Sequence, residues 1–238
     1  MNRLSKVNGV VLVGGFGTRL RVVVPELPKV LAEISGKPFL FYILDQLSEA
    51  GLKTVILCTG YLGDYVKSKV GEKYRSLSIK YSHETTPLGT GGALSLALPY
   101  IQSSDVLVSN GDSYCSADLV GMWEWHMKKK AMATLLLTHM DDTSRYGHVS
   151  MASVDRIIGF NEKESTSKPG WINAGVYLIR RELLTDIPEK KCVSLEREVF
   201  PSWCHRGLYG YQTHSKFIDI GTPESYAQAE RFFTTITI

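Results

Sequence analysis

Near the N-terminus, a short apolar run ends in three closely spaced glycines. Residues 10–13 are Val-Val-Leu-Val, and Gly14, Gly15 and Gly17 follow directly. An apolar run of this length, bounded by turn residues, is typical of a buried strand. Glycine has no β-carbon, so the backbone after the strand can turn sharply and bring its N–H groups against an anion. The segment therefore predicts a buried strand followed by an anion-binding turn.

Two cations, Arg19 and Lys29, follow these glycines, and together they suit a nucleoside triphosphate. The turn is not a P-loop, because no Lys-Ser or Lys-Thr pair follows it. It also departs from the dinucleotide fingerprint, since Leu20 stands where the third glycine belongs and residues 22–25 interrupt the helix that should follow. From the glycines alone, a tight turn without a ligand stays an alternative.

Strand-like and helical segments alternate along the chain. The strands are expected at 9–13, 54–58, 79–83, 106–109, 133–138, 148–154, 157–161 and 176–179, and the helices at 39–50, 63–70, 93–98, 118–130 and 223–233. This alternation predicts an α/β fold with a mostly parallel sheet and helices on both faces. Without a repeat or a linker-like stretch, residues 1–238 are expected to form one domain, with a nucleotide half at about 1–132 and an acceptor half at about 133–238.

Composition and charge argue against several classes of protein. The net charge is only +3 and the basic residues are scattered, which does not suggest a nucleic-acid partner. The four cysteines are widely spaced, which predicts neither a disulfide framework nor a zinc site. Residues 1–8 are too short and polar for a signal peptide, and no apolar run approaches the length of a membrane span. We therefore expect a cytoplasmic enzyme with no membrane partner.

Ligands of such sheets bind beyond the carboxyl ends of the strands, so the loops there are candidates. The loop at 84–93 is rich in glycine and opens a helix, so its N–H groups could face an anion or a base. Glu84 in this loop could accept hydrogen bonds from the N1–H and N2–H₂ groups of guanine. The alternative is a glycine-rich helix start with Glu84 in solvent.

Two aspartates also follow strand-like runs. Asp112 comes after 107–110, and Asp219 comes after 217–218. Carboxylates together with phosphate oxygens are ligands that Mg²⁺ prefers. The alternatives are a simple Asn-Gly-Asp turn around Asp112 and, near Asp219, a helix start with Thr222 and Pro223 as its cap and first turn.

The second half of the chain holds polar residues that could contact a sugar phosphate. Glu162 and Asn173 could bind sugar hydroxyls, and Lys163 could bind the phosphate. Gly147, just before the expected strand 148–154, allows a close approach of the backbone. The alternative is that these residues are only surface ion pairs and turn residues, which a sequence does not distinguish from sugar-phosphate contacts.

Taken in order, these segments resemble the sugar-1-phosphate nucleotidyltransferases. The matching segments are 14–20, 27–29, 36–38, 87–93, 110–112, 162–163, 173–177 and 219–223. Within that family, 171–177 and 193–198 are similar to the short bacterial D-glycero-α-D-manno-heptose 1-phosphate guanylyltransferases. The resemblance implies a Rossmann-like, mixed and mostly parallel sheet of the nucleotidyltransferase type, without a C-terminal β-helix.

The resemblance also implies a reaction: transfer of GMP from GTP to a sugar 1-phosphate, with Mg²⁺ or Mn²⁺ as cofactor. A GDP-heptose made this way serves lipopolysaccharide, capsule or S-layer glycans. A mannose-1-phosphate guanylyltransferase, a sugar-1-phosphate uridylyltransferase and a non-catalytic, nucleotide-sugar-binding regulatory subunit are the alternatives. A homo-oligomer such as a dimer is compatible with the sequence.

The same resemblance assigns roles to individual residues. The catalytic set is Arg19, Lys29, Asp112, Lys163 and Asp219, of which Asp112 and Asp219 would bind the metal. The expected nucleotide contacts are Leu12, Gly14, Gly15, Gly17, Thr18, Arg19, Lys29, Glu84, Pro87, Gly89, Thr90, Gly111 and Asp112. The expected sugar contacts are Gly147, Glu162, Lys163, Asn173 and Asp219.

Overall fold

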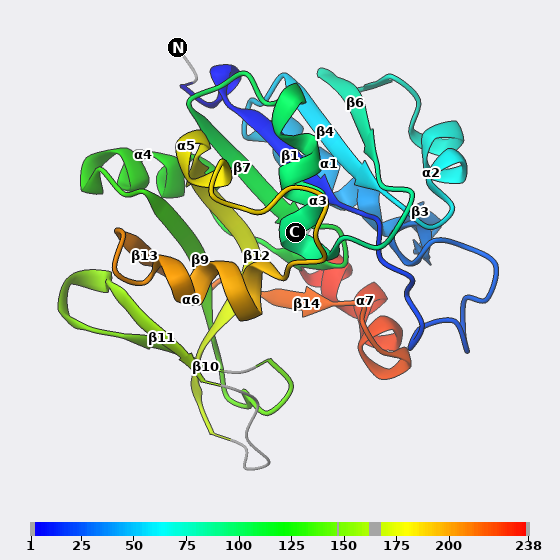
Figure 1. The fold of residues 1–238 in the computed structure, drawn as a ribbon. Helices are drawn as coiled ribbons and strands as arrows, with labels where there is room; N and C mark the ends of the chain where they lie inside the picture. Colours follow the sequence, from blue (N-terminus) through cyan, green and yellow to red (C-terminus); the bar gives the residue numbers. More distant parts are fainter. Residues whose placement is uncertain (1–2, 147, 162–167, 237–238) are drawn as a thin grey trace.

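The computed structural model describes residues 3–146, 148–161 and 168–236, and an eight-stranded sheet lies at its centre (Figure 1). The strands follow the order β13-β9-β12-β7-β1-β4-β6-β5. Their bounds are β1 (Asn8–Leu12), β4 (Thr54–Thr59), β5 (Lys73–Tyr74), β6 (Leu77–His83), β7 (Asp105–Asn110), β9 (Ala133–Met140), β12 (Gly170–Arg180) and β13 (Leu208–Thr213). Strands β7, β1, β4 and β6 are parallel neighbours, whereas β12 runs antiparallel between β7 and β9. The expected mixed, mostly parallel sheet is confirmed.

Helices cover both faces of this sheet (Figure 1). One face packs against α1 (Phe39–Glu49), α2 (Gly63–Val70), α4 (Leu119–Lys129) and α7 (Pro223–Ile236), and the other against α3 (Gly89–Ala97), α5 (Arg181–Leu184) and α6 (Phe200–Trp203). Within β1, Val11 belongs to the first of these two cores and Val10 to the second. A strand that is buried on both faces needs apolar side chains at consecutive positions, which explains the apolar run in the sequence.

Shorter elements join and position these layers. Three two-stranded ribbons pair β2 (Glu33–Ile34) with β3 (Lys37–Pro38), β10 (His148–Met151) with β11 (Ile157–Asn161), and β8 (Ser113–Cys115) with β14 (Phe217–Asp219). Short helical turns lie at Arg3–Lys6, Lys29–Leu31, Leu98–Tyr100, Ser153–Asp155 and Leu195–Val199. The β8–β14 ribbon sets Asp219 opposite Ser113 and therefore brings Asp219 close to Asp112.

Three predicted elements differ from the structure. The strand expected at 148–154 ends at Met151, because Val154 and Asp155 have φ angles of 61° and 67° that turn the chain. The helix expected at 93–98 begins at Gly89, so the glycine-rich segment forms its first turn. The strand expected at 176–179 is only part of Gly170–Arg180, and its earlier half brings Asn173 into the sheet.

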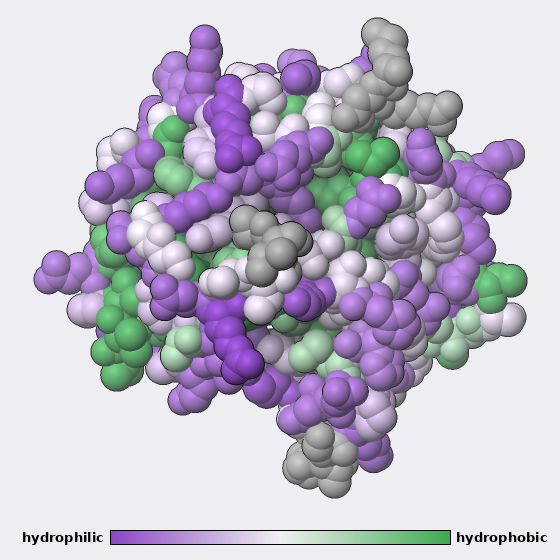
Figure 2. Space-filling view, turned by 180° about the vertical axis from the view of Figure 1, so that it is seen from behind, coloured by the Kyte–Doolittle hydropathy of each residue, from purple (hydrophilic) through white to green (hydrophobic). Residues whose placement is uncertain are grey.

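Figure 2 views the surface from the side opposite to that of Figure 1. Figure 2 shows this face as mainly hydrophilic, with small hydrophobic areas between the polar ones. Of the helices in the described part of the chain, none is long and apolar enough to cross a membrane.

The N-terminus of α4 offers a test of local stability. Asp118 Oδ1 accepts hydrogen bonds from Val120 N at 3.0 Å and Gly121 N at 2.9 Å, which satisfies two helix donors that would otherwise be unpaired. We expect Asp118→Ala to lower the free energy of unfolding by about 1 kcal/mol, and Asp118→Asn to lower it by less. Urea denaturation measures both variants. Equal stability of Asp118→Ala and the native protein would contradict the capping role.

Candidate active site

The carboxyl ends of β1, β4, β6 and β7 meet at one edge of the sheet, and Cys58 of β4, together with the loops that follow β1, β6 and β7, borders a cavity of about 400 Å³. Twelve of the thirteen predicted nucleotide contacts line this cavity: Leu12, Gly14, Gly15, Gly17, Thr18, Arg19, Lys29, Glu84, Pro87, Gly89, Thr90 and Asp112. Gly111 lies behind the wall, where its N–H donates to Leu12 O at 2.9 Å. A β-carbon on Gly111 would stand 2.6 Å from that oxygen, so this glycine supports the turn.

The glycine turn holds Lys29 against the cavity. Gly17 has a φ of +60°, and a β-carbon there would stand 2.9 Å from Lys29 Cβ. Lys29 Nζ pairs with Asp112 Oδ2 at 2.7 Å, and its side chain is only 10% exposed. Only glycine at position 17 leaves room for the Lys29 side chain, and Asp112 balances the ammonium charge. The Lys29 ammonium and the Asp112 carboxylate are therefore held together in the lining of the cavity.

Glu84 reaches into the opposite wall of the cavity. Its Oε2 accepts a hydrogen bond from Leu88 N at 3.1 Å. Its Oε1 lies 3.0 Å and 2.8 Å from the points where Gly14 and Gly60 would carry β-carbons, so only glycine leaves room for the carboxylate at both positions. Burial raises the pKa of Glu84, and the hydrogen bond from Leu88 opposes this rise. Gly60 was not predicted, although its place directly after β4 was the available signal.

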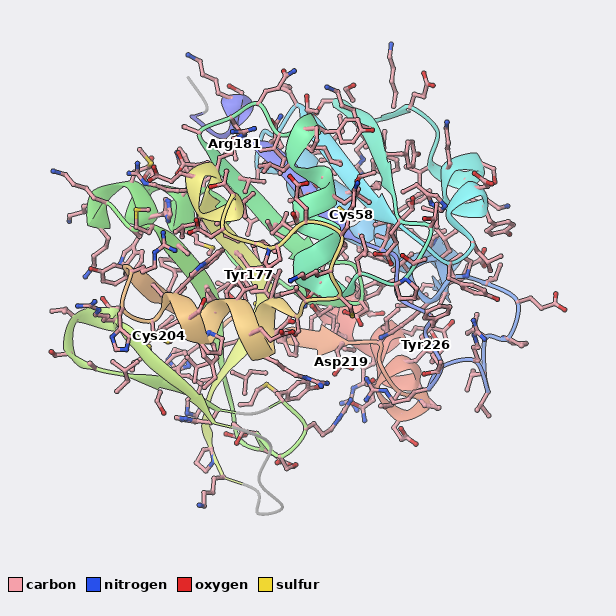
Figure 3. All side chains as sticks on the ribbon, viewed as in Figure 1. Cys58, Tyr177, Arg181, Cys204, Asp219 and Tyr226 are labelled. Carbon is pink, nitrogen blue, oxygen red and sulfur yellow. The ribbon has the colours of Figure 1, made fainter. Side chains whose placement is uncertain are left out.

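A hydrogen-bonded chain connects this wall to the second half of the protein. Thr90 Oγ1 donates to Glu196 Oε2 at 2.8 Å, and the Tyr177 hydroxyl donates to Glu196 Oε1 at 3.4 Å. Asn173 Nδ2 donates to the same hydroxyl at 3.0 Å. Tyr177 is fully buried on β12 (Figure 3), and this burial keeps its pKa well above the usual value. Neither Tyr177 nor Glu196 was predicted as a site residue.

A second cavity of about 440 Å³ adjoins the first. Arg19, Asn110 and Asp112 line both cavities, and the second is completed by Ser113, Arg145, Tyr146, Asn173, Gly175, Phe217, Asp219 and Thr222. The predicted sugar contacts Asn173 and Asp219 are therefore found together here. Gly147, Glu162 and Lys163 lie outside the described residues, so their roles stay predictions.

Asp219 is the last residue of β14 (Figure 3). Several donors hold its carboxylate. Gly221 N donates to its Oδ1 at 2.8 Å, and the Tyr146 hydroxyl donates to Oδ2. Burial, followed by the hydrogen bond to Asp219, raises the pKa of Tyr146, so the phenol keeps the proton it donates. Arg145 Nη2 lies 3.1 Å from Oδ2 and 3.3 Å from Oδ1. Arg145 was not predicted.

Asp219 and two cations gather around Gly221. The point where Gly221 would carry a β-carbon lies 2.6 Å from Asp219 Oδ1, 3.5 Å from Lys29 Nζ and 3.7 Å from Arg19 Nη2. Ile220 N also donates to Asp112 O at 2.9 Å, which ties the two aspartate segments together. The described residues contain no cluster of three or more metal-binding side chains. Two carboxylates fit a hard cation such as Mg²⁺, which completes its shell with phosphate oxygens and water.

The family of the chain follows from its sequence as a whole. Residues 8–236 match the nucleotidyl transferase family. The chain belongs to this family. The nucleotidyltransferase is 39% identical to a D-glycero-alpha-D-manno-heptose 1-phosphate guanylyltransferase of Aneurinibacillus thermoaerophilus, over 94% of this chain and 97% of that one. It is 37% identical to a mannose-1-phosphate guanylyltransferase of Mycobacterium tuberculosis, over 94% of this chain and 63% of that one.

A solved structure has the same fold as this nucleotidyltransferase. The crystal structure of HddC from Yersinia pseudotuberculosis, complexed with GMP-PN, matches with a TM-score of 0.85 and 33% identity. The match covers 95% of this chain and 99% of HddC. The family and fold expected from the sequence are thus confirmed.

Proposed function

We propose that this nucleotidyltransferase transfers GMP from GTP to D-glycero-α-D-manno-heptose 1-phosphate and releases pyrophosphate. The carrying observation is the wall shared by the two cavities, which Arg19, Asn110 and Asp112 form. A nucleotide in the first cavity and a sugar 1-phosphate in the second would bring their phosphates together at this wall. The similarity to the heptose 1-phosphate guanylyltransferase of Aneurinibacillus thermoaerophilus extends over 97% of that enzyme, and this similarity supports the choice of both substrates.

The chemistry requires positioning and charge neutralisation. The sugar phosphate is anionic near neutral pH, so its oxygen can attack the α-phosphorus of GTP without a general base. A phosphorus–oxygen bond to the sugar phosphate forms as the bond to the bridging oxygen breaks, and pyrophosphate leaves with the electron pair. Fixed cations that face these phosphates lower the barrier. Arg19 and Lys29 would stabilise the leaving pyrophosphate, and Lys163 would orient the attacking phosphate.

Asp112 and Asp219 are the residues that would hold Mg²⁺ or Mn²⁺. Bound there, the metal would neutralise charge on the phosphate oxygens. Tyr146 and Gly221 fix the orientation of Asp219 by their hydrogen bonds, and the paired strands β8 and β14 fix its distance from Asp112.

The proposed reaction is tested by pyrophosphate release with Mg²⁺, measured for four nucleoside triphosphates against several sugar 1-phosphates. We expect GTP with the heptose 1-phosphate to give the highest kcat/KM. Faster turnover with mannose 1-phosphate, or with UTP, would instead identify one of the alternative transferases. Binding of a nucleotide sugar without any pyrophosphate release would indicate a regulatory subunit.

Glu84 is the proposed reader of the guanine base. A carboxylate can accept from both N1–H and N2–H₂ of guanine, whereas a glutamine amide replaces one acceptor by a donor. We therefore expect Glu84→Gln to raise the KM for GTP by about tenfold or more, with a smaller change for UTP. Pyrophosphate release measured with each nucleotide checks this difference. Equal losses for GTP and UTP would contradict base reading by Glu84.

The proposed product also indicates a setting. GTP and a sugar 1-phosphate are intracellular metabolites, so we infer a cytoplasmic enzyme that supplies GDP-heptose for a cell-surface glycan. We also propose that the protein forms a homodimer. Light scattering tests this by measuring the mass of the protein in solution.

A further inference from the structure

Arg145 forms an ion pair with Asp219, one of the two carboxylates that would hold the metal. Its Nη2 lies 3.1 Å from Asp219 Oδ2 and 3.3 Å from Oδ1, so it bridges both oxygens. The other carboxylate, Asp112, pairs with Lys29. In the structure, each of these two acids is therefore paired with a side-chain cation.

The two cations differ in their freedom to move. The Lys29 side chain is 10% exposed and packs beside Gly17, whereas the Arg145 side chain is 45% exposed. Arg145 also lines two cavities, the one that contains Asp112 and a neighbouring one of about 460 Å³ beside α7. Its guanidinium also lies 5.3 Å from the centre of the Tyr146 ring, between these two cavities. The Arg145 end of this ion pair is 45% exposed and the Asp219 end 17% exposed, so water screens the pair from the arginine side and can solvate the guanidinium when it leaves.

Asp219 can exchange this partner without losing its position. The hydrogen bonds from Gly221 N and the Tyr146 hydroxyl remain when Arg145 withdraws, and each carboxylate oxygen still has lone pairs to offer. A divalent cation and a guanidinium cannot share the same carboxylate edge, because their like charges repel at that distance. Metal at Asp219 would consequently release the guanidinium into the cavity that also contains Asn173.

A released guanidinium in that cavity suits a phosphate. Arginine presents parallel N–H donors that match two phosphate oxygens, and its charge is permanent. We infer that Arg145 is a substrate-binding residue that exchanges partners. It pairs with Asp219 in the metal-free protein and binds the phosphate of the sugar 1-phosphate once a divalent cation takes Asp219. This inference rests on the proposed function for the identity of that anion.

The first test needs no turnover. Mn²⁺ is titrated into the substrate-free protein, and free Mn²⁺ is followed by electron paramagnetic resonance. Arg145→Gln removes the competing cation, so we expect it to bind Mn²⁺ about two- to fivefold more tightly than the native protein. Arg206→Gln is the matched control, because Arg206 is an equally exposed partner of Asp186 that lines none of the three cavities. Unchanged or weaker Mn²⁺ binding by Arg145→Gln overturns the exchange.

The second test uses steady-state kinetics. We expect Arg145→Gln to raise the KM for the sugar 1-phosphate by about tenfold or more, with the KM for GTP changed by less than about twofold. Arg145→Lys keeps the charge but loses the parallel donors, so it should recover part of the loss. An unchanged KM for the sugar 1-phosphate in both variants overturns the phosphate contact. If the native protein released no pyrophosphate with any substrate pair, the proposed function would fail while the Mn²⁺ titration still decides the exchange.

Discussion

Asp112→Asn is expected to lower kcat/KM for pyrophosphate release by about 10²-fold or more, the loss typical when charge stabilisation of a transition state is removed. Asp112 lines both cavities and pairs with Lys29, so it stands where the two phosphates would meet. The amide has no negative charge to offer a divalent cation, and it leaves the ammonium of Lys29 without its counter-charge. The measurement is turnover with GTP and the heptose 1-phosphate at saturating Mg²⁺.

The same variant should keep its fold. Asparagine has nearly the shape of aspartate, and the Asp112 side chain is 47% exposed, so little packing is lost. Asp186→Asn is the control, because Asp186 is a similarly exposed acid that pairs with an arginine and lines neither active-site cavity. We expect that control to retain native turnover. Turnover near the native rate in a folded Asp112→Asn protein would contradict the metal-binding role of Asp112.

The first half of the fold could be predicted because its strands are buried on both faces. Residues such as Val10 and Val11 must both be apolar, which leaves continuous runs that alternate with helical patterns. Strand β13 was missed, since it carries Gly210 and Gln212 and lies at the edge of the sheet. The end of β10 was misplaced because the left-handed conformation of Val154 is rare for a β-branched residue and has no signal in the sequence.

Three of the predicted site residues share one local signal. Gly14 and Asp112 each follow a buried parallel strand, Glu84 follows the partly buried parallel strand β6, and parallel strands end at the same edge of a sheet. Arg145 has no such signal: it lies in a polar segment after β9, and its partner Asp219 is 74 residues away. Contacts of that separation depend on how the β8–β14 ribbon packs, which only the folded chain shows.

Gly89→Ala is the second change with a large expected effect, because Gly89 meets two steric limits at once. Its φ is +69°, and a β-carbon there would stand 2.6 Å from Val193 O. That oxygen accepts a hydrogen bond from Gly91 N at 2.8 Å, so it cannot move away without breaking the start of α3. The left-handed backbone costs an alanine about 1–2 kcal/mol, and overpacking costs about 1–3 kcal/mol more. We expect the free energy of unfolding to fall by more than about 2 kcal/mol.

Gly36→Ala separates these two contributions. Gly36 has a φ of +74°, yet no atom lies within 4 Å of the point where its β-carbon would stand, so this variant meets only the backbone cost of about 1–2 kcal/mol. Denaturation of both variants therefore isolates the contact with Val193 as the difference between them. Since Gly89 lines the nucleotide cavity and Gly36 does not, Gly89→Ala alone should also raise the KM for GTP. Equal stability of the two variants would show that the Val193 backbone moves away from the new β-carbon at little cost. The predicted steric penalty at Gly89 would then be wrong.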